Sequence, residues 1–197
     1  MTDIETIVEE WKESLTIDDW HLISRYQALS EPFIEKYKDK IDWSCISYSQ
    51  KLSERFIEKY QDKLNWSDIS YFKTLSESFI EKWKDKVDWH YISINQTLSE
   101  PFIEKWKDKL NWDCLLFNKK IRWTNFIEKY QDRLKLFYLL RNENINWTEF
   151  SEEFFDKYHQ HFNLEEMNKK RPFSKQFCFK YNLDWRWNNF CPQNKIT

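Results

Sequence analysis

The chain has 197 residues, of which 19% are aromatic and 32% are charged, and its net charge is −2. This composition is too apolar for a disordered chain and too charged for a membrane protein, and the length allows one or two domains. Glycine is absent, which excludes a glycine-rich phosphate loop, a dinucleotide fingerprint and a nucleophile elbow. The charge does not indicate nucleic-acid binding, although a local basic stripe is compatible with it.

The N-terminal stretch MTDIETIVEEWKESL is acidic and lacks the basic start and apolar middle of a signal peptide. The sequence has no run of about 18 apolar residues, so no membrane-spanning helix is expected. We therefore expect a cytoplasmic protein without a membrane partner.

A repeat with a period of 23 residues organises the chain. It is marked by five tryptophans at equal spacing: Trp20, Trp43, Trp66, Trp89 and Trp112. We divide a single domain, 1–197, into an N-terminal capping unit (1–28), four regular repeats (29–121), and degenerate repeats with a C-terminal cap (122–197). NFIEKYQDRL is a fifth copy shifted by one residue, and EFFDKYHQHF and FCFKYNLDW are decayed copies. This gives about eight units in all.

The first half of each unit, LSEPFIEKYKDK in the first regular repeat, predicts a short helix. Ser30 is a candidate N-cap, Glu31 favours the positive end of the helix dipole, and Pro32 is tolerated in the first turn. Apolar residues then recur on one face, at Phe33, Ile34, Tyr37 and Ile41. A helix this short is not stable alone, so stacking of units must stabilise it.

The second half of each unit predicts another helix of about two turns, capped by Asp42 in the first regular repeat. Its constant positions are the tryptophan and the residues three, four and seven places later, such as Ile46, Ser47 and Gln50. These steps of three and four favour a helix over the strand of a leucine-rich repeat, which also has a 23-residue form. The predicted fold is an all-α solenoid of short two-helix repeats.

The positions that change between units lie on the opposite face of the second helix. Together they form the predicted partner-binding face: Arg25, Tyr26, Ser44, Tyr48, Ser67, Asp68, Tyr71, Phe72, His90, Tyr91, Ile94, Asn95, Asp113, Phe117 and Asn118. Neutral drift on a solvated face would favour lysine, glutamate, serine and asparagine instead of these aromatics. A binding surface and a helix buried on both sides remain two open explanations.

Charged residues of the first helix recur unchanged, as in Glu35, Lys36, Asp39 and Lys40. Their constancy predicts ladders in which an acid of one unit meets a base of the next. Each exposed pair contributes roughly 0–1 kcal/mol, so we expect these ladders to set register more than stability. A lysine stripe that tracks phosphates is the alternative, but the interleaved acids would cancel much of its field.

Catalytic, metal-binding and cofactor-binding residues are not evident. The histidines His21 and His90 fall on the varying face, and no HExxH or CxxC motif is present. We expect the four cysteines to be reduced thiols. An unrepeated constellation would have to lie in the irregular segment 136–197, around His159 and Glu165, where no motif appears. We expect no enzyme activity.

LSEPFIEKYKDKIDW and its copies resemble the LSEEFI-type repeat arrays of uncharacterised proteins from giant DNA viruses and phage-like genomes. The resemblance covers roughly residues 20–135. It implies a viral accessory protein that acts inside a host cell, and it carries over no activity and no site residue.

The leading functional expectation is a protein-binding scaffold that sequesters or inhibits a host protein. One alternative is an RNA- or nucleotide-binding repeat protein that stacks bases on its aromatics. Another is a self-assembling structural protein, because exposed aromatics can also meet their own copies in a homo-oligomer.

Overall fold

The computed structural model describes residues 3–121, 124–130, 133–134 and 145–184. Throughout these ranges the chain is helical or irregular and contains no strand. Contacts divide it into two compact units, Met1–Asn111 (unit 1) and Trp112–Thr197 (unit 2). The predicted all-α solenoid of short repeats is confirmed. The subdivision at residues 28 and 121 stays a prediction.

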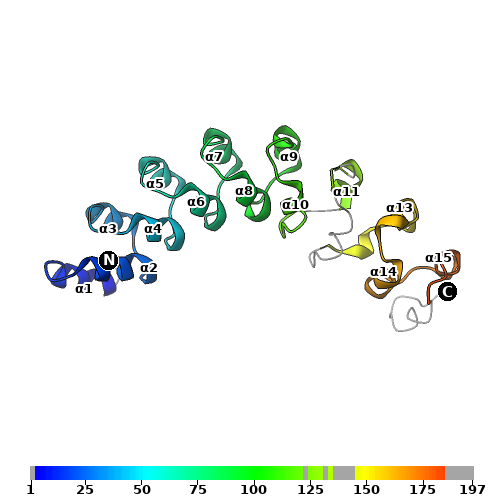
Figure 1. Cartoon of the computed structure of the whole chain (residues 1–197), viewed down its shortest axis with the longest axis horizontal. Coiled ribbons are helices and arrows are strands. Elements are labelled where there is room, and N and C mark those ends of the chain that lie inside the picture. Colours follow the sequence, from blue (N-terminus) through cyan, green and yellow to red (C-terminus); the bar gives the residue numbers. More distant parts are fainter. Residues whose placement is uncertain (1–2, 122–123, 131–132, 135–144, 185–197) are drawn as a thin grey trace. The chain divides into compact units, whose positions relative to one another are not determined.

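Unit 1 is a stack of helix pairs. Its helices are α1 (Asp3–Trp11), α2 (Ile17–Tyr26), α3 (Glu31–Lys36), α4 (Trp43–Ser49), α5 (Glu54–Lys59), α6 (Trp66–Phe72), α7 (Glu77–Lys82), α8 (Trp89–Asn95) and α9 (Glu100–Trp106). The first helices of the repeats, α3, α5, α7 and α9, form one row (Figure 1). The second helices form the other row, in which α2 contacts α4, α4 contacts α6, and α6 contacts α8.

Side-chain caps begin both helices of each regular repeat of unit 1. The Ser76 hydroxyl accepts a hydrogen bond from the Phe79 amide and starts α7, as Ser30 does for α3. Asp88 accepts from two amides at the start of α8. In addition, the Glu54 carboxylate of the preceding repeat accepts a hydrogen bond of 2.5 Å from the Ser76 amide. The caps therefore join neighbouring repeats as well as starting helices.

Buried serines connect the second helices to the following repeat. The Ser70 hydroxyl donates to the Trp66 carbonyl (2.7 Å) and accepts from the Asp88 amide of the next repeat (2.9 Å). Ser24, Ser47 and Ser93 make the same pair of bonds. This explains why serine is constant at a position where an apolar residue would fill the space equally well.

We expect Ser70→Ala to lower the free energy of unfolding by about 1–2 kcal/mol, because it leaves the buried Asp88 amide without its acceptor. Chemical denaturation checks this value. Ser44→Ala is the matched control, because Ser44 is exposed on α4 and its replacement should change stability little. Equal effects of the two changes would contradict the role given to the buried serines.

The predicted charge ladders are confirmed. Lys82 pairs with Glu58 of the preceding repeat at 2.7 Å, and Lys86 pairs with Asp62 at 2.9 Å. The same columns pair along unit 1, in Lys59–Glu35, Lys105–Glu81, Lys63–Asp39 and Lys109–Asp85. Lysine ammonium groups also lie over the tryptophans, as Lys86 does over Trp66 at 5.8 Å.

Unit 2 contains α10 (Trp112–Leu115), α11 (Thr124–Tyr130), η1 (Trp147–Glu149), α13 (Glu152–Tyr158), η2 (His159–His161), α14 (Leu164–Lys170) and α15 (Lys175–Lys180). Its decayed copies keep the contacts of the regular repeats. Ser174 caps α15, the Glu152 carboxylate accepts from its amide, and Lys180 pairs with Asp156. Segments 135–144 and 185–197, which include Cys191, lie outside the described residues.

Candidate interaction surface

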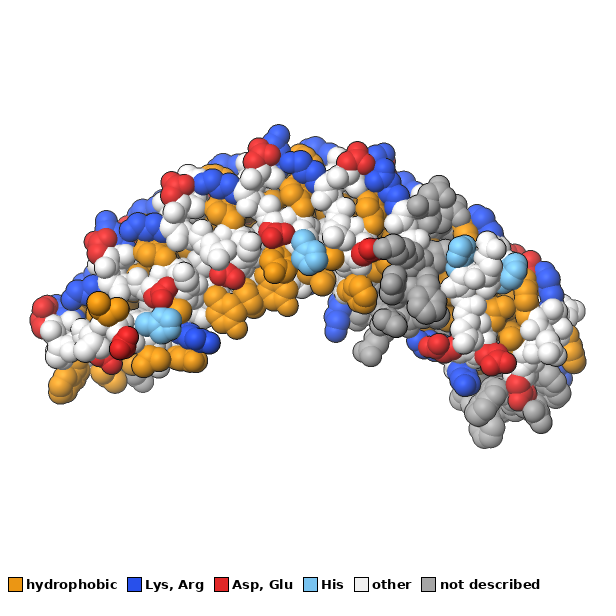
Figure 2. All heavy atoms as spheres, in the orientation of Figure 1, with side chains coloured by type: hydrophobic (Ala, Val, Ile, Leu, Met, Phe, Trp, Pro, Cys, Tyr) orange, Lys and Arg blue, Asp and Glu red, His pale blue; other side chains and the backbone are white. Residues whose placement is uncertain are grey.

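Aromatic side chains line the outer side of the second helices in unit 1. Tyr26, Tyr48, Tyr71 and Phe72 are 66%, 49%, 42% and 44% exposed, and Tyr91 is half-buried. We call these five residues the aromatic surface. Figure 2 shows hydrophobic side chains gathered over the row of second helices of unit 1 and charged side chains over the row of first helices.

The helical period places these rings outward. In α6 the residues three and four places after Trp66 are fully buried, and Tyr71 and Phe72 follow directly on the opposite side. The exposed fractions lie between those expected for a solvated face and for a core. These rings are therefore partly exposed, and the choice between a binding surface and a helix buried on both sides stays a prediction.

The rings contact one another from helix to helix. Tyr48 of α4 meets Phe72 of α6 edge-to-face, with ring centroids 4.4 Å apart. Within α6, Tyr71 meets Phe72 at 4.5 Å, and Tyr71 also meets Tyr91 of α8 at 5.0 Å. The aromatic surface is consequently continuous over three repeats between Tyr48 and Tyr91.

Polar residues of the predicted face surround these rings. The Asn95 amide donates to the Tyr71 carbonyl at 3.2 Å, and the Ser67 hydroxyl donates to the Asp88 carboxylate at 3.3 Å. Burial raises the pKa of Asp68, and the charge of Lys73 partly offsets that rise. The remaining members in unit 1 are Arg25, Ser44 and His90, which are exposed, and Ile94, which is half-buried.

The members of the predicted face in unit 2 differ. Asp113 is exposed and Phe117 is 44% exposed, but Asn118 is fully buried. The prediction of a surface role for Asn118 was wrong. In regular repeats the buried polar residue follows the tryptophan by seven positions, as in Gln96 after Trp89, whereas Asn118 follows Trp112 by six. Here α10 ends at Leu115, and the amides of Phe117 and Asn118 donate to the carbonyls three residues back. This tighter turn brings the inward position forward by one residue.

An apolar groove lies between α1 and α2, at one end of the aromatic surface. It has a volume of about 600 Å³ and is lined by Ile7, Trp11, Leu22 and Tyr26, among others. Trp11 is 61% exposed and Leu22 is 51% exposed. The sequence prediction placed Arg25 and Tyr26 of the capping unit on the partner-binding face but included no residue of α1. The signal was present in the apolar spacing of Ile4, Ile7, Val8 and Trp11.

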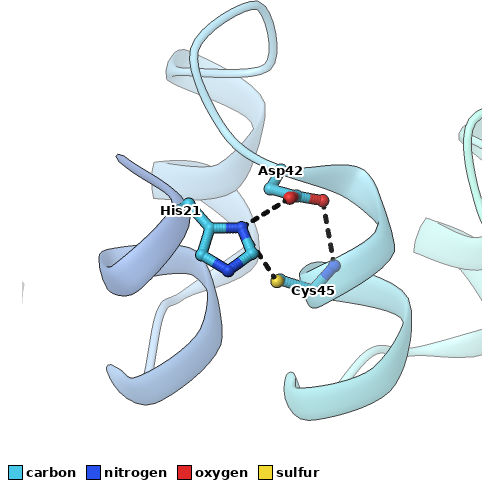
Figure 3. Close-up of side chains that lie close together, drawn as sticks. All are labelled: His21, Asp42 and Cys45. Carbon is cyan, nitrogen blue, oxygen red and sulfur yellow. Dashed lines mark hydrogen bonds and ion pairs between the residues drawn. The ribbon is translucent and has the colours of Figure 1, made fainter. Parts of the chain in front are cut away.

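Three potential metal ligands meet near the same end of unit 1 (Figure 3). His21 of α2 places its Nδ1 atom 2.8 Å from Oδ2 of Asp42, the N-cap of α4. The Sγ atom of Cys45 lies 3.7 Å from the same nitrogen. The other Asp42 oxygen, Oδ1, accepts hydrogen bonds from the amides of Ser44 and Cys45. The cap therefore fixes the carboxylate and leaves Oδ2 facing the histidine.

The electrostatics of this cluster follow from partial burial. Burial favours a higher pKa for Asp42, but hydrogen bonds from His21 and from the amides of Cys45 and Ser44 outweigh it and hold the pKa below its usual value. Burial, reinforced by the Asp42 charge, raises the pKa of the Cys45 thiol. The described cysteines Cys45, Cys114 and Cys178 are free and buried, as expected for reduced thiols.

No linear sequence motif predicts this cluster, because His21 lies in the capping unit whereas Asp42 and Cys45 lie in the first regular repeat. Asp42 lies 21 residues after His21, and Cys45 lies 24 residues after it. The signal that could have found them is the period itself. A residue of one repeat lies beside the residues about 23 positions later, and the Ser67–Asp88 bond joins the same two columns two repeats further along.

These features define an α-helical solenoid whose second helices carry a semi-exposed aromatic surface. None of the described helices combines the length and hydropathy that crossing a bilayer requires. Comparisons with protein-family models, with curated proteins and with solved structures found no match.

Proposed function

We propose that this protein is a non-enzymatic scaffold that binds another protein through the aromatic surface. The observation that carries the proposal is the continuous array of half-exposed rings on α4, α6 and α8. Exposed aromatic clusters on a monomer are typical of protein interfaces, where tyrosine supplies large contact area at a small entropic cost. The groove between α1 and α2 extends this surface and would accept an apolar side chain of the partner.

The ring geometry favours a protein partner over a nucleic acid. Base stacking needs open ring faces, whereas Tyr48, Tyr71 and Phe72 pack edge-to-face against each other. The first-helix lysines also do not form an unbalanced basic stripe, because lysines such as Lys82 and Lys86 pair with carboxylates. We further propose that the partner is a host protein that is sequestered or inhibited, as the repeat resemblance suggests.

The double change Tyr71→Ala with Phe72→Ala should abolish capture of the partner while the helical circular dichroism stays unchanged. The two rings are 42% and 44% exposed, so a loss of about 1 kcal/mol each in stability is expected from their packed portions. The measurement is affinity capture of the tagged chain from host lysate after nuclease treatment and a high-salt wash. Bound proteins are then identified by mass spectrometry and compared between variants.

Phe179→Ala is the matched control, because Phe179 is an exposed aromatic (71%) on α15 of unit 2 and is not a member of the aromatic surface. It should leave capture intact. A partner that is lost at high salt or after nuclease treatment would instead support nucleic-acid binding. Equal capture by the wild-type chain and the double variant would contradict the proposed surface, and concentration-dependent light scattering that the double change abolishes would indicate self-assembly.

A further inference from the structure

We propose that His21, Asp42 and Cys45 form a zinc-binding site between α2 and α4 of unit 1. The ligands are Nδ1 of His21, Oδ2 of Asp42 and Sγ of Cys45. These three ligand atoms lie within 4.8 Å of one another. This inference is independent of the aromatic surface and of any protein partner.

The spacing of the ligand atoms fits a tetrahedral ion. Bonds of about 2.0 Å to nitrogen and oxygen and about 2.3 Å to sulfur separate tetrahedral ligands by about 3.3 Å (N to O) and about 3.5 Å (N to S). The observed separations from His21 Nδ1 are 2.8 Å to Asp42 Oδ2 and 3.7 Å to Cys45 Sγ. A shift of His21 Nδ1 by roughly half an ångström away from Asp42 Oδ2 would bring the N–O separation to its tetrahedral value. The N–S separation is already within about 0.2 Å of its own tetrahedral value.

The ligand types select the metal. A thiolate, an imidazole and a carboxylate together suit Zn²⁺ better than Mg²⁺ or Ca²⁺, which prefer oxygen ligands. Three protein ligands leave one coordination position for water or for a group of another molecule. The side chains of His21 and Asp42 are 44% and 34% exposed, so an ion can reach the cluster from solvent.

The protein also holds the cluster in place. The Asp42 carboxylate is fixed by two backbone amides at the start of α4, and hydrogen bonds of this kind to a ligating carboxylate orient it for the metal. Within the part of the chain that the structure describes, no other three His, Cys, Asp or Glu side chains come this close together. Because the ligands come from α2 and from the start of α4, a bound ion would link the N-terminal capping unit to the first regular repeat.

The test is titration of the chelator-treated full chain with Zn²⁺ in a calorimeter, followed by Co²⁺ substitution. We expect about one zinc ion per chain at this site and a thiolate-to-cobalt charge-transfer band. Zn²⁺ should also raise the melting temperature, because binding to the folded state stabilises it. His21→Ser, Asp42→Asn and Cys45→Ser should each weaken Zn²⁺ binding roughly ten-fold or more, and Cys45→Ser should remove the charge-transfer band.

These variants are expected to fold, because other repeats already carry the introduced residue at the positions of His21 and Asp42, and Cys45→Ser replaces a thiol by a hydroxyl of similar size. Serine occupies the His21 position at Ser44 and Ser67, and Asn65 caps α6 as Asp42 caps α4. His90→Ser is the matched control, because His90 occupies the same repeat position as His21 and should be dispensable for Zn²⁺. The proposal is overturned if the wild-type chain binds no Zn²⁺. It is equally overturned if His21→Ser and Cys45→Ser bind Zn²⁺ as tightly as His90→Ser does.

Discussion

Lys73→Gln should make the protein more stable by about 4 kcal/mol at pH 7. Lys73 is 7% exposed and occupies the column in which Gln50 and Gln96 are buried. Its ammonium donates to the carbonyls of Gln50 (2.6 Å) and Tyr48 (3.2 Å). Burial lowers the pKa of Lys73 to about 8, and the charge of Asp68 only partly offsets that effect. A buried charge whose pKa falls from 10.5 to about 8 destabilises the folded state by about 3 kcal/mol at pH 7.

A second contribution to the stability of Lys73→Gln comes from a backbone amide that glutamine can pair and lysine cannot. In the repeats with glutamine, the side-chain oxygens of Gln50 and Gln96 accept hydrogen bonds from the amides of Leu29 (2.9 Å) and Leu75 (3.0 Å). The protonated Lys73 side chain has no acceptor for the corresponding Leu52 amide. The glutamine variant restores that acceptor, which contributes about 1 kcal/mol.

The pH dependence distinguishes the two contributions. Between pH 8 and 10.5 the unfolded chain retains the Lys73 proton while the folded chain loses it, so this group makes the wild-type protein more stable as pH rises. The difference between Lys73→Gln and wild type should therefore fall from about 4 kcal/mol at pH 7 to about 1 kcal/mol above pH 10.5.

Urea denaturation at several pH values measures this difference. Lys51→Gln is the control, because Lys51 is exposed and the same change there should have little effect at any pH. A Lys73→Gln variant less stable than wild type at pH 7 would show that the ammonium is well solvated in place. A difference that does not change with pH would exclude the lowered pKa.

The repeat made much of this architecture predictable from sequence. Each position of the repeat occurs several times in one chain, so a residue type that stays constant at one position indicates a structural constraint. The caps at Ser30 and Asp42 and the pairing of acids with lysines of the next repeat were all predicted in this way and are confirmed. These features depend on local helix geometry and on a fixed period, both of which are visible in the sequence.

Contacts that depend on side-chain chemistry across repeats were harder to predict. The sequence showed that Gln50 points inward, but not that it bonds to the backbone of the preceding repeat. It gave no reason to connect His21 with Asp42 and Cys45, because the geometry between stacked helices sets which columns touch. The Asn118 prediction failed because the tighter turn after α10 changes which residue points inward, and the sequence does not show that turn.

The second large effect is expected at Gln50, which occupies the repeat position equivalent to that of Lys73. Gln50 is 4% exposed and makes three hydrogen bonds to the backbone of residues 24–29. Its amide nitrogen donates to the carbonyls of Ser24 (2.9 Å) and Gln27 (2.7 Å), and its oxygen accepts from Leu29. Gln50→Leu keeps the volume nearly constant but removes the partner of the Gln27 carbonyl and of the Leu29 amide, whereas the Ser24 carbonyl keeps its hydrogen bond from the Ser49 hydroxyl.

We expect Gln50→Leu to lower the free energy of unfolding by about 2–4 kcal/mol, at about 1–2 kcal/mol for each of the two unpaired groups. Gln50→Lys should cost less, because lysine at the equivalent position, Lys73, still reaches two carbonyls. Urea denaturation of both variants beside wild type tests this order. If Gln50→Leu is the more stable of the two, apolar burial outweighs backbone pairing at this column. In that case the constancy of polar residues at the column would need an explanation other than stability, such as the register between repeats.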